Sequence, residues 1–542
     1  LEAAARFEGE FRDMAFLLEM LPDTALRRRV AIPALIRLRG SAGADRGTFS
    51  TASTLSADGG ELSVKGRFNP REQSYDAAIR ADSFPLNSFL PADSLGIVDL
   101  TLQARGTGFD PLLPRTRTSL RAQIDRAEFG GRDFGGIELD AELDSQRLSG
   151  RISDRDEALR LLLSVSGTLT EREQRIGLSG SVFGFDLAAL GVSPEPIGGS
   201  FALDASASAA GKGAYAARIA LDSIEIRNKH RTDRIRPTSV SLHTDSAATR
   251  AEAASGDLSL TFSTPQSADS LIAALTRSAR ALAGQIDAQS IDMEQLKPAL
   301  PDFALRVSAG PDNILNSLLK SRKIAFDALN AEGANCDSLP VSIRLRTEGL
   351  AYGNVVLDTV TADIRQNGKR LEYALGLANA PGNLDNIARA GLYGHLVRNT
   401  GQANLYQRNR AGREGFRFGL DVTWTDSLVR ASVTPPDPLF GFEPWTVNRG
   451  NYLAYRFDKR VEADLDMTHG DQRFAIRTTP GGGDDDDIRL DIAGLNVGPA
   501  MGLFPSAPPV DGVLGANLTL NLAADSLSLR GGVSVAELTY DK

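Results

Sequence analysis

The chain has 542 residues, a formal net charge of −9, 24% charged residues and 6% aromatic residues. This balance excludes a disordered acidic chain and a basic nucleic-acid binder, so we expect no nucleic-acid partner. The single cysteine, Cys336, excludes an internal disulfide bond. On length alone the chain would form about three to four domains.

The first predicted element is an amphipathic helix over residues 1–25. Its apolar residues recur at helical spacing, as Phe7, Phe11 and Met14 do. The chain opens abruptly on LEAAARFEGEF and stops within the strand-like VAELTYDK, so we expect it to be a piece of a longer parent. No run of about 18 apolar residues occurs in it.

Residues 26–266 are predicted to be β-repeats. In GIVDLTLQARGTGFDP (96–111), Val98, Leu100 and Leu102 fall on one side of an extended chain, and polar residues fall on the other. The pattern returns in GGSFALDASASAAGKG (198–213), and clusters of Gly, Asn, Asp and Ser separate the runs. Such punctuation is typical of meandering antiparallel sheets. Roughly 30–40 short strands would fit the whole chain and make a sheet on the order of 140–190 Å long.

The elements that follow mix helix and strand. A helical insertion is predicted over 267–330, starting at a cap such as Ser267, and a short helical segment over 381–400. Further β-structure is predicted over 331–380 and β-repeats over 401–542. Each helix is amphipathic and needs an apolar surface, for which the sheet is the nearest candidate. Apolar elbows, usually closed by proline, recur between strands, as in FPLNSFLP (84–91) and LNVGPAMGLFP (495–505).

Motifs of catalysis are missing from the sequence. The four histidines lack metal-ligand spacing, and neither a dinucleotide or phosphate loop nor a nucleophile elbow is present. We therefore expect no enzyme, no catalytic residue, no metal and no cofactor.

Strands with one apolar side need something to cover that side, because exposed apolar surface is unfavourable in water. A second sheet can pack on it, the sheet can close into a barrel, or the sheet can curl into a trough lined for something the chain does not encode. Small residues such as Ala104, Ala205 and Ala516 alternate with Leu, Val and Phe on that side. This favours a trough that accepts flexible chains over a densely filled sandwich. The predicted fold is therefore mostly β: an elongated, curled antiparallel sheet (a β-taco or open trough), with a few amphipathic helices on the apolar groove or capping it.

Two segments carry a family resemblance: DIRLDIAGLNVGPAMGLFPSAPPVDGVLGANLTLNL (487–522) and, more loosely, YDAAIRADSFPLNSFLPADSLGIVDLTLQARGTGFDP (75–111). They resemble repeats of the AsmA-like, bridge-like lipid transfer family of Gram-negative envelopes, in its TamB branch, the inner-membrane component of the translocation and assembly module. The resemblance covers most of residues 30–265 and 340–542. The predicted helical stretches depart from the unbroken sheet of that family.

The resemblance implies a periplasmic bridge that carries phospholipids between the two membranes and supports outer-membrane biogenesis and protein assembly. It implies an inner-membrane anchor and an Omp85-type outer-membrane barrel partner, both reached through parts of the parent outside this chain. The partners within the chain would be phospholipid acyl chains. The residues assigned to the groove lining are Val98, Leu100, Leu102, Phe201, Leu203, Phe416, Phe418, Leu420, Val422, Leu490, Ile492, Leu514, Leu518, Leu520 and Leu522.

Two other classes stay open. The same side chains are ordinary core positions if the chain is a structural or adhesive β-repeat protein that binds a partner protein along its edge, with a closed core and no lipid conduit. A carbohydrate-binding or polysaccharide-acting β-solenoid would show rows of surface aromatics, and Trp424 and Trp445 are the only tryptophans.

Overall fold

The computed structural model describes residues 2–14, 16, 18, 30–91, 95–211, 213–229, 231–320, 322–336, 339–353, 355–379, 389–434, 437–458, 460–479, 487–501, 510–523 and 526–540. Strands make up 68% of it and helices 9%, and the strands form one large antiparallel sheet that is not closed. The described residues contribute 37 strands to this sheet, which is within the predicted number. The chain divides into two compact units, residues 1–246 with 253–256, and residues 247–252 with 257–542.

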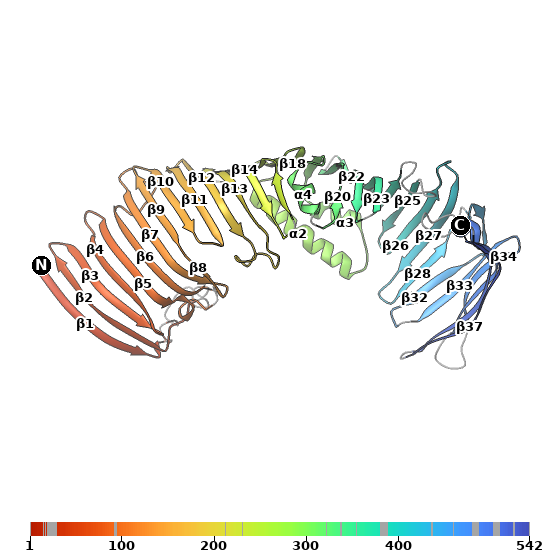
Figure 1. Cartoon of the computed structure of the whole chain (residues 1–542), viewed down its shortest axis with the longest axis horizontal. Helices are drawn as coiled ribbons and strands as arrows, with labels where there is room; N and C mark the ends of the chain where they lie inside the picture. The colour runs from red at the N-terminus through yellow and green to blue at the C-terminus, as the bar shows by residue number, and fades with distance from the viewer. Residues whose placement is uncertain are drawn as a thin grey trace. The chain divides into compact units, whose positions relative to one another are not determined.

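Unit 1 is a succession of antiparallel strands in sequence order (Figure 1, red to yellow). Its strands are β1 (Glu2–Arg12), β2 (Leu35–Asp45), β3 (Thr48–Ala57), β4 (Gly60–Asn69), β5 (Ser74–Pro85), β6 (Leu95–Thr107), β7 (Arg117–Phe129), β8 (Arg132–Phe134), β9 (Ile137–Asp144), β10 (Arg147–Arg155), β11 (Leu159–Leu169), β12 (Glu173–Asp186), β13 (Gly198–Ala210), β14 (Ala214–Arg227), β15 (Thr232–Ile235) and β16 (Thr238–Thr244). β17 (Thr249–Ser255) contributes residues to both units. Each long strand pairs with the next, and β8 and β15 are short side pairings of β7 and β14.

Tight hairpins explain this order. Arg46 and Gly47 join β2 to β3, and Asp58 and Gly59 join β3 to β4, all with positive φ. Two-residue turns with both φ values positive match the twist of the strands they join. Neighbours in sequence therefore become neighbours in the sheet.

The predicted helix over residues 1–25 is wrong over Glu2–Arg12, because these residues form strand β1. β1 pairs with β2 over its whole length, from Glu2 opposite Asp45 to Arg12 opposite Leu35. The residues Phe7 and Phe11 are four apart, which suits a helix turn but also two periods of a strand. Pairing with a neighbouring strand decides between the two. The rest of the predicted helix lies largely in residues outside the described set.

Unit 2 holds the remaining strands and most of the helices (Figure 1, green to blue). Its strands are β18 (Leu258–Thr264), β19 (Phe303–Ala309), β20 (Ile324–Ala325), β21 (Ala328–Cys336), β22 (Leu339–Tyr352), β23 (Val355–Asn367), β24 (Arg370–Ala378), β25 (Arg389–Val397), β26 (Thr400–Arg408), β27 (Glu414–Trp424), β28 (Leu428–Val433), β29 (Leu439–Phe440), β30 (Glu443–Pro444), β31 (Thr446–Val447), β32 (Tyr452–Arg456), β33 (Val461–His469), β34 (Gln472–Thr479), β35 (Asp487–Asn496), β36 (Val510–Ala523) and β37 (Ser526–Tyr540). Its helices are α2 (Ala268–Asp287), α3 (Met293–Leu296), η3 (Lys297–Ala299), α4 (Ile314–Lys320) and α5 (Val497–Met501).

The predicted helical insertion is confirmed in part. α2 begins after Ser267, whose side chain accepts a hydrogen bond from the backbone N–H of Ser270 at 3.3 Å. Between α2 and α4 the chain returns to the sheet as β19, and after α4 it continues as β20 and β21. The last part of the predicted insertion is therefore helical only over Ile314–Lys320, because the residues that follow find strand partners in β19 and β22.

The short helical segment predicted over 381–400 is wrong in its described part. Residues 381–388 lie outside the described set, and Arg389–Val397 forms β25, hydrogen-bonded to β24 on one side and β26 on the other. The predicted elbows become short helical turns where they are described. Examples are η2 (Leu86–Ser88) between β5 and β6, and α5 between β35 and β36.

Candidate functional site

The sheet of unit 1 carries one apolar face, formed by side chains that directly oppose each other across successive strands. One row starts at the predicted residue Leu102 and ends at the predicted residue Leu203: Leu102, Ala122, Leu139, Ile152, Leu163, Gly180 and Leu203. A parallel row runs from Leu100 to Phe201: Leu100, Ile124, Ile137, Asp154, Leu161, Val182 and Phe201. The two predicted patches of unit 1 are thus joined by rows that are apolar except at Asp154.

Along each strand, residues on the apolar face are more buried than their neighbours on the reverse face. In β9, Glu138, Asp140 and Glu142 are exposed, whereas Leu139 is half-buried and Leu143 is buried. The predicted residues Val98, Leu100, Leu102, Phe201 and Leu203 are all half-buried. Leu163 in the middle of a row retains only 7% of its exposure.

One carboxylate interrupts the apolar rows. Asp154 is buried between Ile137 and Leu161, and its Oδ1 accepts a hydrogen bond from the backbone N–H of Asp156 at 2.9 Å. Burial raises the pKa of Asp154 above its ordinary value, because a charged carboxylate loses its hydration there. The hydrogen bond makes Asp154 a turn-forming residue at the end of β10.

In unit 2 the predicted lining residues also share faces. Leu490 lies directly opposite Leu518, and Ile492 lies opposite Ala516. Phe418 lies opposite Leu405, and Leu420 lies opposite both Ala403 and Val433. Phe416, Phe418, Leu420, Val422, Leu490, Ile492, Leu514, Leu518 and Leu520 are all half-buried. The side chain of Leu522 lies outside the described residues.

A cluster around Trp445 covers part of the apolar face of unit 2. Trp445 is 2% exposed and packs with Leu465 and Met467, and Phe418 and Leu495 pack against this cluster. Trp445 comes from the segment 437–451, which inserts β29 beside β27 and β31 beside β33 where β28 and β32 are too short to fill the sheet. At this place the predicted lining residue Phe418 belongs to a closed local core.

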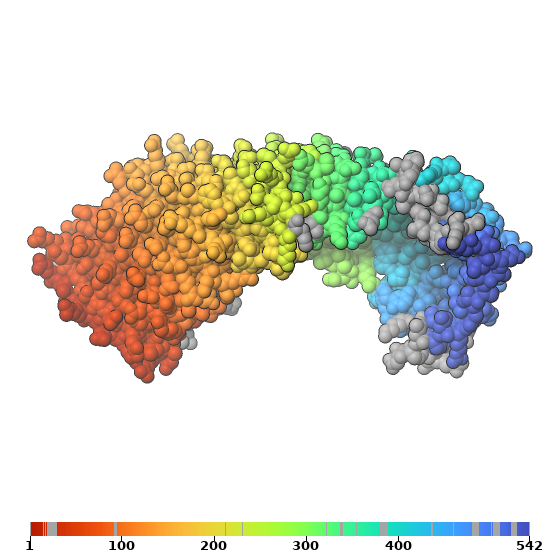
Figure 2. Space-filling model, in the orientation of Figure 1, coloured from red at the N-terminus to blue at the C-terminus, as the bar shows by residue number. Residues whose placement is uncertain are grey.

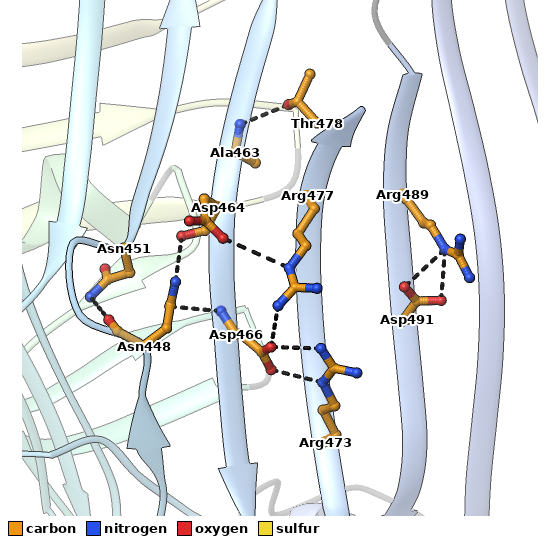
Figure 3. Close-up of polar contacts among 10 residues, drawn as sticks. All are labelled: Asn448, Asn451, Ala463, Asp464, Asp466, Arg473, Arg477, Thr478, Arg489 and Asp491. Carbon is orange, nitrogen blue, oxygen red and sulfur yellow. Dashed lines mark hydrogen bonds and ion pairs between the residues drawn. The ribbon is translucent and has the colours of Figure 1, made fainter. Parts of the chain in front are cut away.

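Polar contacts join the segment 437–451 to β33, and further polar contacts join β33 to β34 (Figure 3). Asn448 accepts a hydrogen bond from the backbone N–H of Asp466 at 2.9 Å, and Asn451 Nδ2 donates to the Asn448 carbonyl at 3.1 Å. The Asp466 carboxylate accepts hydrogen bonds from Arg473 at 2.9 and 2.6 Å and also pairs with Arg477. Its hydrogen bonds with Arg473 hold the pKa of Asp466 below the ordinary value. The network joins the loop that carries Trp445 to the sheet.

The helix α2 differs from the expectation that its apolar side would lie on the sheet. Its buried stripe is narrow and mostly small or polar, as Ala274, Ser278 and Gln285 show. Its large apolar residues Ile272, Leu275, Leu282 and Ile286 stay exposed. Met293 and Leu296 of the short α3 instead reach the sheet and pack with Val341. Among the described residues, no helix is both long enough and apolar enough to cross a bilayer.

The reverse of the apolar face is charged and hollowed. In unit 1 a hollow of about 850 Å³ is lined by residues that include Asp76, Gln103, Arg105, Arg121, Asp140 and Arg151. Its charges are largely paired across strands, as Arg105 with Asp76 at 2.9 Å and Arg121 with Asp140 at 2.7 Å show. Opposite charges on neighbouring strands stabilise the register of a sheet.

Two features of the apolar face were missed by sequence reasoning. Trp445 had a weak signal, since it directly follows Pro444 in FGFEPW, a stretch with three aromatic residues. Ile343 and Leu375 are large residues on the same face as Val341 and stay exposed. Their strands alternate clearly, so the period-2 pattern was sufficient to find them.

Comparison with protein-family models, with curated proteins and with solved structures finds no match for this chain.

Proposed function

We propose that the chain is part of a periplasmic bridge of a Gram-negative bacterium that carries phospholipids between the inner and outer membranes along its apolar face. The observation that supports this most directly is the continuity of the rows from Leu102 to Leu203 and from Leu100 to Phe201. The family resemblance of residues 487–522 supports the location and the role in outer-membrane biogenesis and protein assembly. In this proposal the inner membrane and an Omp85-type barrel are reached by other parts of the parent.

The energetic case follows from the size of an acyl chain. Moving the ~30 CH₂ groups of a phospholipid into water costs about 24 kcal/mol, at ~0.8 kcal/mol for each. A face lined by Leu, Val, Ile and Phe removes most of that cost. Because the rows repeat similar side chains, no single place would hold a lipid tightly, and lipids could slide. This mechanism requires neither a catalytic residue nor a cofactor.

We propose further that the sheet curls into a trough with the apolar face inside. Leu163 keeps only 7% of its exposure although it stands on a sheet face, so its neighbours must lean over it. Apolar side chains converge in this way on a concave face and diverge on a convex one. In unit 2, the packing of Phe418 from β27 and Leu495 from β35 around the Trp445 cluster points the same way.

The alternative is a structural or adhesive β-repeat protein with a closed core. The Trp445 cluster favours it locally, because Leu465 and Met467 are buried there like ordinary core residues. The exposed Leu529 and Val533 of β37 and Leu375 of β24 favour the conduit. The two readings differ in what occupies the apolar face.

A photocrosslinking experiment separates them. A photoreactive amino acid replaces Leu102 on the apolar face or Gln103, its neighbour on the charged face, and the parent protein is irradiated in cells. We expect a phospholipid-sized mass adduct at position 102 and none at 103. Adducts of equal yield at both positions, or a protein adduct without lipid at 102, would contradict the proposal.

A further inference from the structure

The charged face of unit 2 carries a hollow that is unlike the one in unit 1. Its volume is about 430 Å³, within the range of ligand pockets. It is lined by Thr361, Asp363, Ala374, Leu375, Gly376, Tyr393, Tyr406, Arg408, Glu414 and Arg417. Leu405 belongs to the apolar face, because it lies opposite Phe418. Its neighbour Tyr406 therefore belongs to the other face, and so do the remaining lining residues except Leu375.

Glycines form the floor of this hollow. Gly391 lies directly between Gly376 of β24 and Tyr406 of β26. A Cβ added to Gly391 would lie 2.6 Å from Cε1 of the Tyr406 ring and 2.8 Å from its Cζ. The Tyr406 ring therefore lies over the backbone at Gly391, which only a residue without a side chain permits.

A second aromatic ring stands beside the first. Tyr393 is 48% exposed, and its ring centroid lies 6.2 Å from that of Tyr406 with the planes tilted by 56°. Two tilted rings over a glycine floor form a shallow corner with apolar surfaces on two sides. The guanidinium carbon of Arg408 lies over the Tyr406 ring, 5.4 Å from its centroid.

The polar groups around the corner are balanced in charge. Glu414 pairs with Arg417 at 2.8 Å and with Arg408 at 3.6 Å, and Asp363 pairs with Arg344 at 3.5 Å. The Nε of Arg417 is buried and has no hydrogen-bond partner among the described residues. Two cations and two carboxylates line the hollow, which disfavours an anionic ligand such as a nucleotide. Carboxylates and guanidinium groups do suit hydroxyl groups, which both donate and accept hydrogen bonds.

We infer that this hollow binds a sugar unit of a neutral glycan. The C–H side of a pyranose ring would lie on the exposed ring of Tyr393 and against Tyr406, and its hydroxyl groups would bond with Glu414, Arg417 and Asp363. The inference is independent of lipid transport, because the hollow lies on the opposite face of the sheet. It also differs from a carbohydrate-binding solenoid, since it needs one corner of two tyrosines and no rows of tryptophan.

Saturation-transfer NMR and calorimetry with maltotriose, cellotriose and chitotriose test the inference on the intact chain. We expect saturable binding of at least one of these three probes. Tyr393→Ser and Tyr406→Ala should each weaken that binding at least tenfold. Tyr215→Ser in unit 1 is the matched control, because Tyr215 is 49% exposed and lies in no such corner. It should leave binding unchanged.

A second variant guards against a folding defect. Gly391→Ala keeps both tyrosines but places a methyl group against the Tyr406 ring, so the ring must swing away and binding should fall at least tenfold. Circular dichroism confirms the fold of each variant. The inference is overturned if none of the three probes binds, if binding persists in both Tyr406→Ala and Gly391→Ala, or if adenosine monophosphate or a proline-rich peptide displaces the sugar from the same residues.

Discussion

Leu490 on β35 and Leu518 on β36 are direct cross-strand partners, although 27 residues separate them in sequence. Both stand on the apolar face of unit 2, and their neighbours Asp491 and Asn517 face each other on the reverse. Asn517 Nδ2 donates a hydrogen bond to the Asp491 carboxylate there. At this place the sheet therefore has one apolar face and one hydrogen-bonded face.

A charge on the apolar face should remove bound lipid without unfolding the chain. In Leu518→Asp the new carboxylate stands among half-buried apolar side chains, where it keeps access to water but repels acyl chains. We expect the phospholipid that copurifies per protein to fall at least fivefold, with an unchanged circular dichroism spectrum. Thr519→Asp, one residue away on the polar face and opposite Arg489, is the control and should retain its lipid. Equal lipid content in the two variants would contradict a conduit on this face.

The Trp445 cluster should be a local source of stability. Trp445→Ala removes the largest side chain of the cluster and leaves a cavity beside Leu465 and Met467, which should cost about 3–5 kcal/mol of unfolding free energy. Urea unfolding measures this loss of free energy, and native-state hydrogen exchange shows in which strands it falls. Protection should fall in β27 and β31–β34 and stay constant in β2–β12. Tyr455→Ala, at an exposed position nearby, is the control and should cost much less. A uniform loss over both units would show that the cluster is not local.

The Asp466 network should make unit 2 less stable in acid. The folded-state pKa of Asp466 is lowered from 3.8 by Arg473, so the folded state holds the carboxylate ionised more firmly than the unfolded state does. The stabilisation that ionised Asp466 gives the folded state is therefore fully present above the unfolded pKa near 3.8. It is lost as the pH falls through the lower pKa of the folded state. Urea midpoints measured between pH 6 and pH 2.5 should drop for the unaltered chain. In Asp466→Asn that part of the pH dependence should disappear. An identical pH profile for both would refute the assignment.

The two faces of unit 1 should differ sharply in their effect on stability. Leu163→Ala, in the middle of an apolar row, should cost about 2–5 kcal/mol because it opens a cavity among its cross-strand neighbours. Arg121→Ala breaks an exposed ion pair with Asp140 and should scarcely move the urea midpoint, since exposed pairs are screened by water. If the arginine variant were the more damaged, the polar face would hold the sheet together and the apolar face would not.

The strands that alternate over eight or more residues were predictable without any tertiary information. In β9, Ile137, Leu139 and Ala141 alternate with Glu138 and Asp140, and only a strand separates such residues onto two faces. The antiparallel order was also predictable, because short Gly-containing turns leave no room for crossover connections. The helix α2 was recognisable from its cap at Ser267 and its length.

The wrong secondary-structure predictions concern segments whose residue pattern fits both the helical period of 3.6 and the strand period of 2. In β1, Phe7 and Phe11 satisfy a helix and a strand equally, and β2 supplies the hydrogen-bond partners that decide the matter. The same holds for Arg389–Val397 between β24 and β26. A helix bonds within its own segment, whereas a strand needs a partner distant in sequence, and no local pattern contains that partner.

The sequence by itself determined that this protein is a long series of strands with one apolar side, because side-chain alternation is a local property of the extended backbone. Only the tertiary structure decided how far each apolar side is covered. Trp445 is buried because β28 and β32 end early and the loop between them fills the sheet, while Leu375 on the same face stays exposed. Tyr406 lies over Gly391 because the register of β25 and β26 sets them opposite each other. Burial and register depend on which distant segments meet, and that is a property of the whole fold.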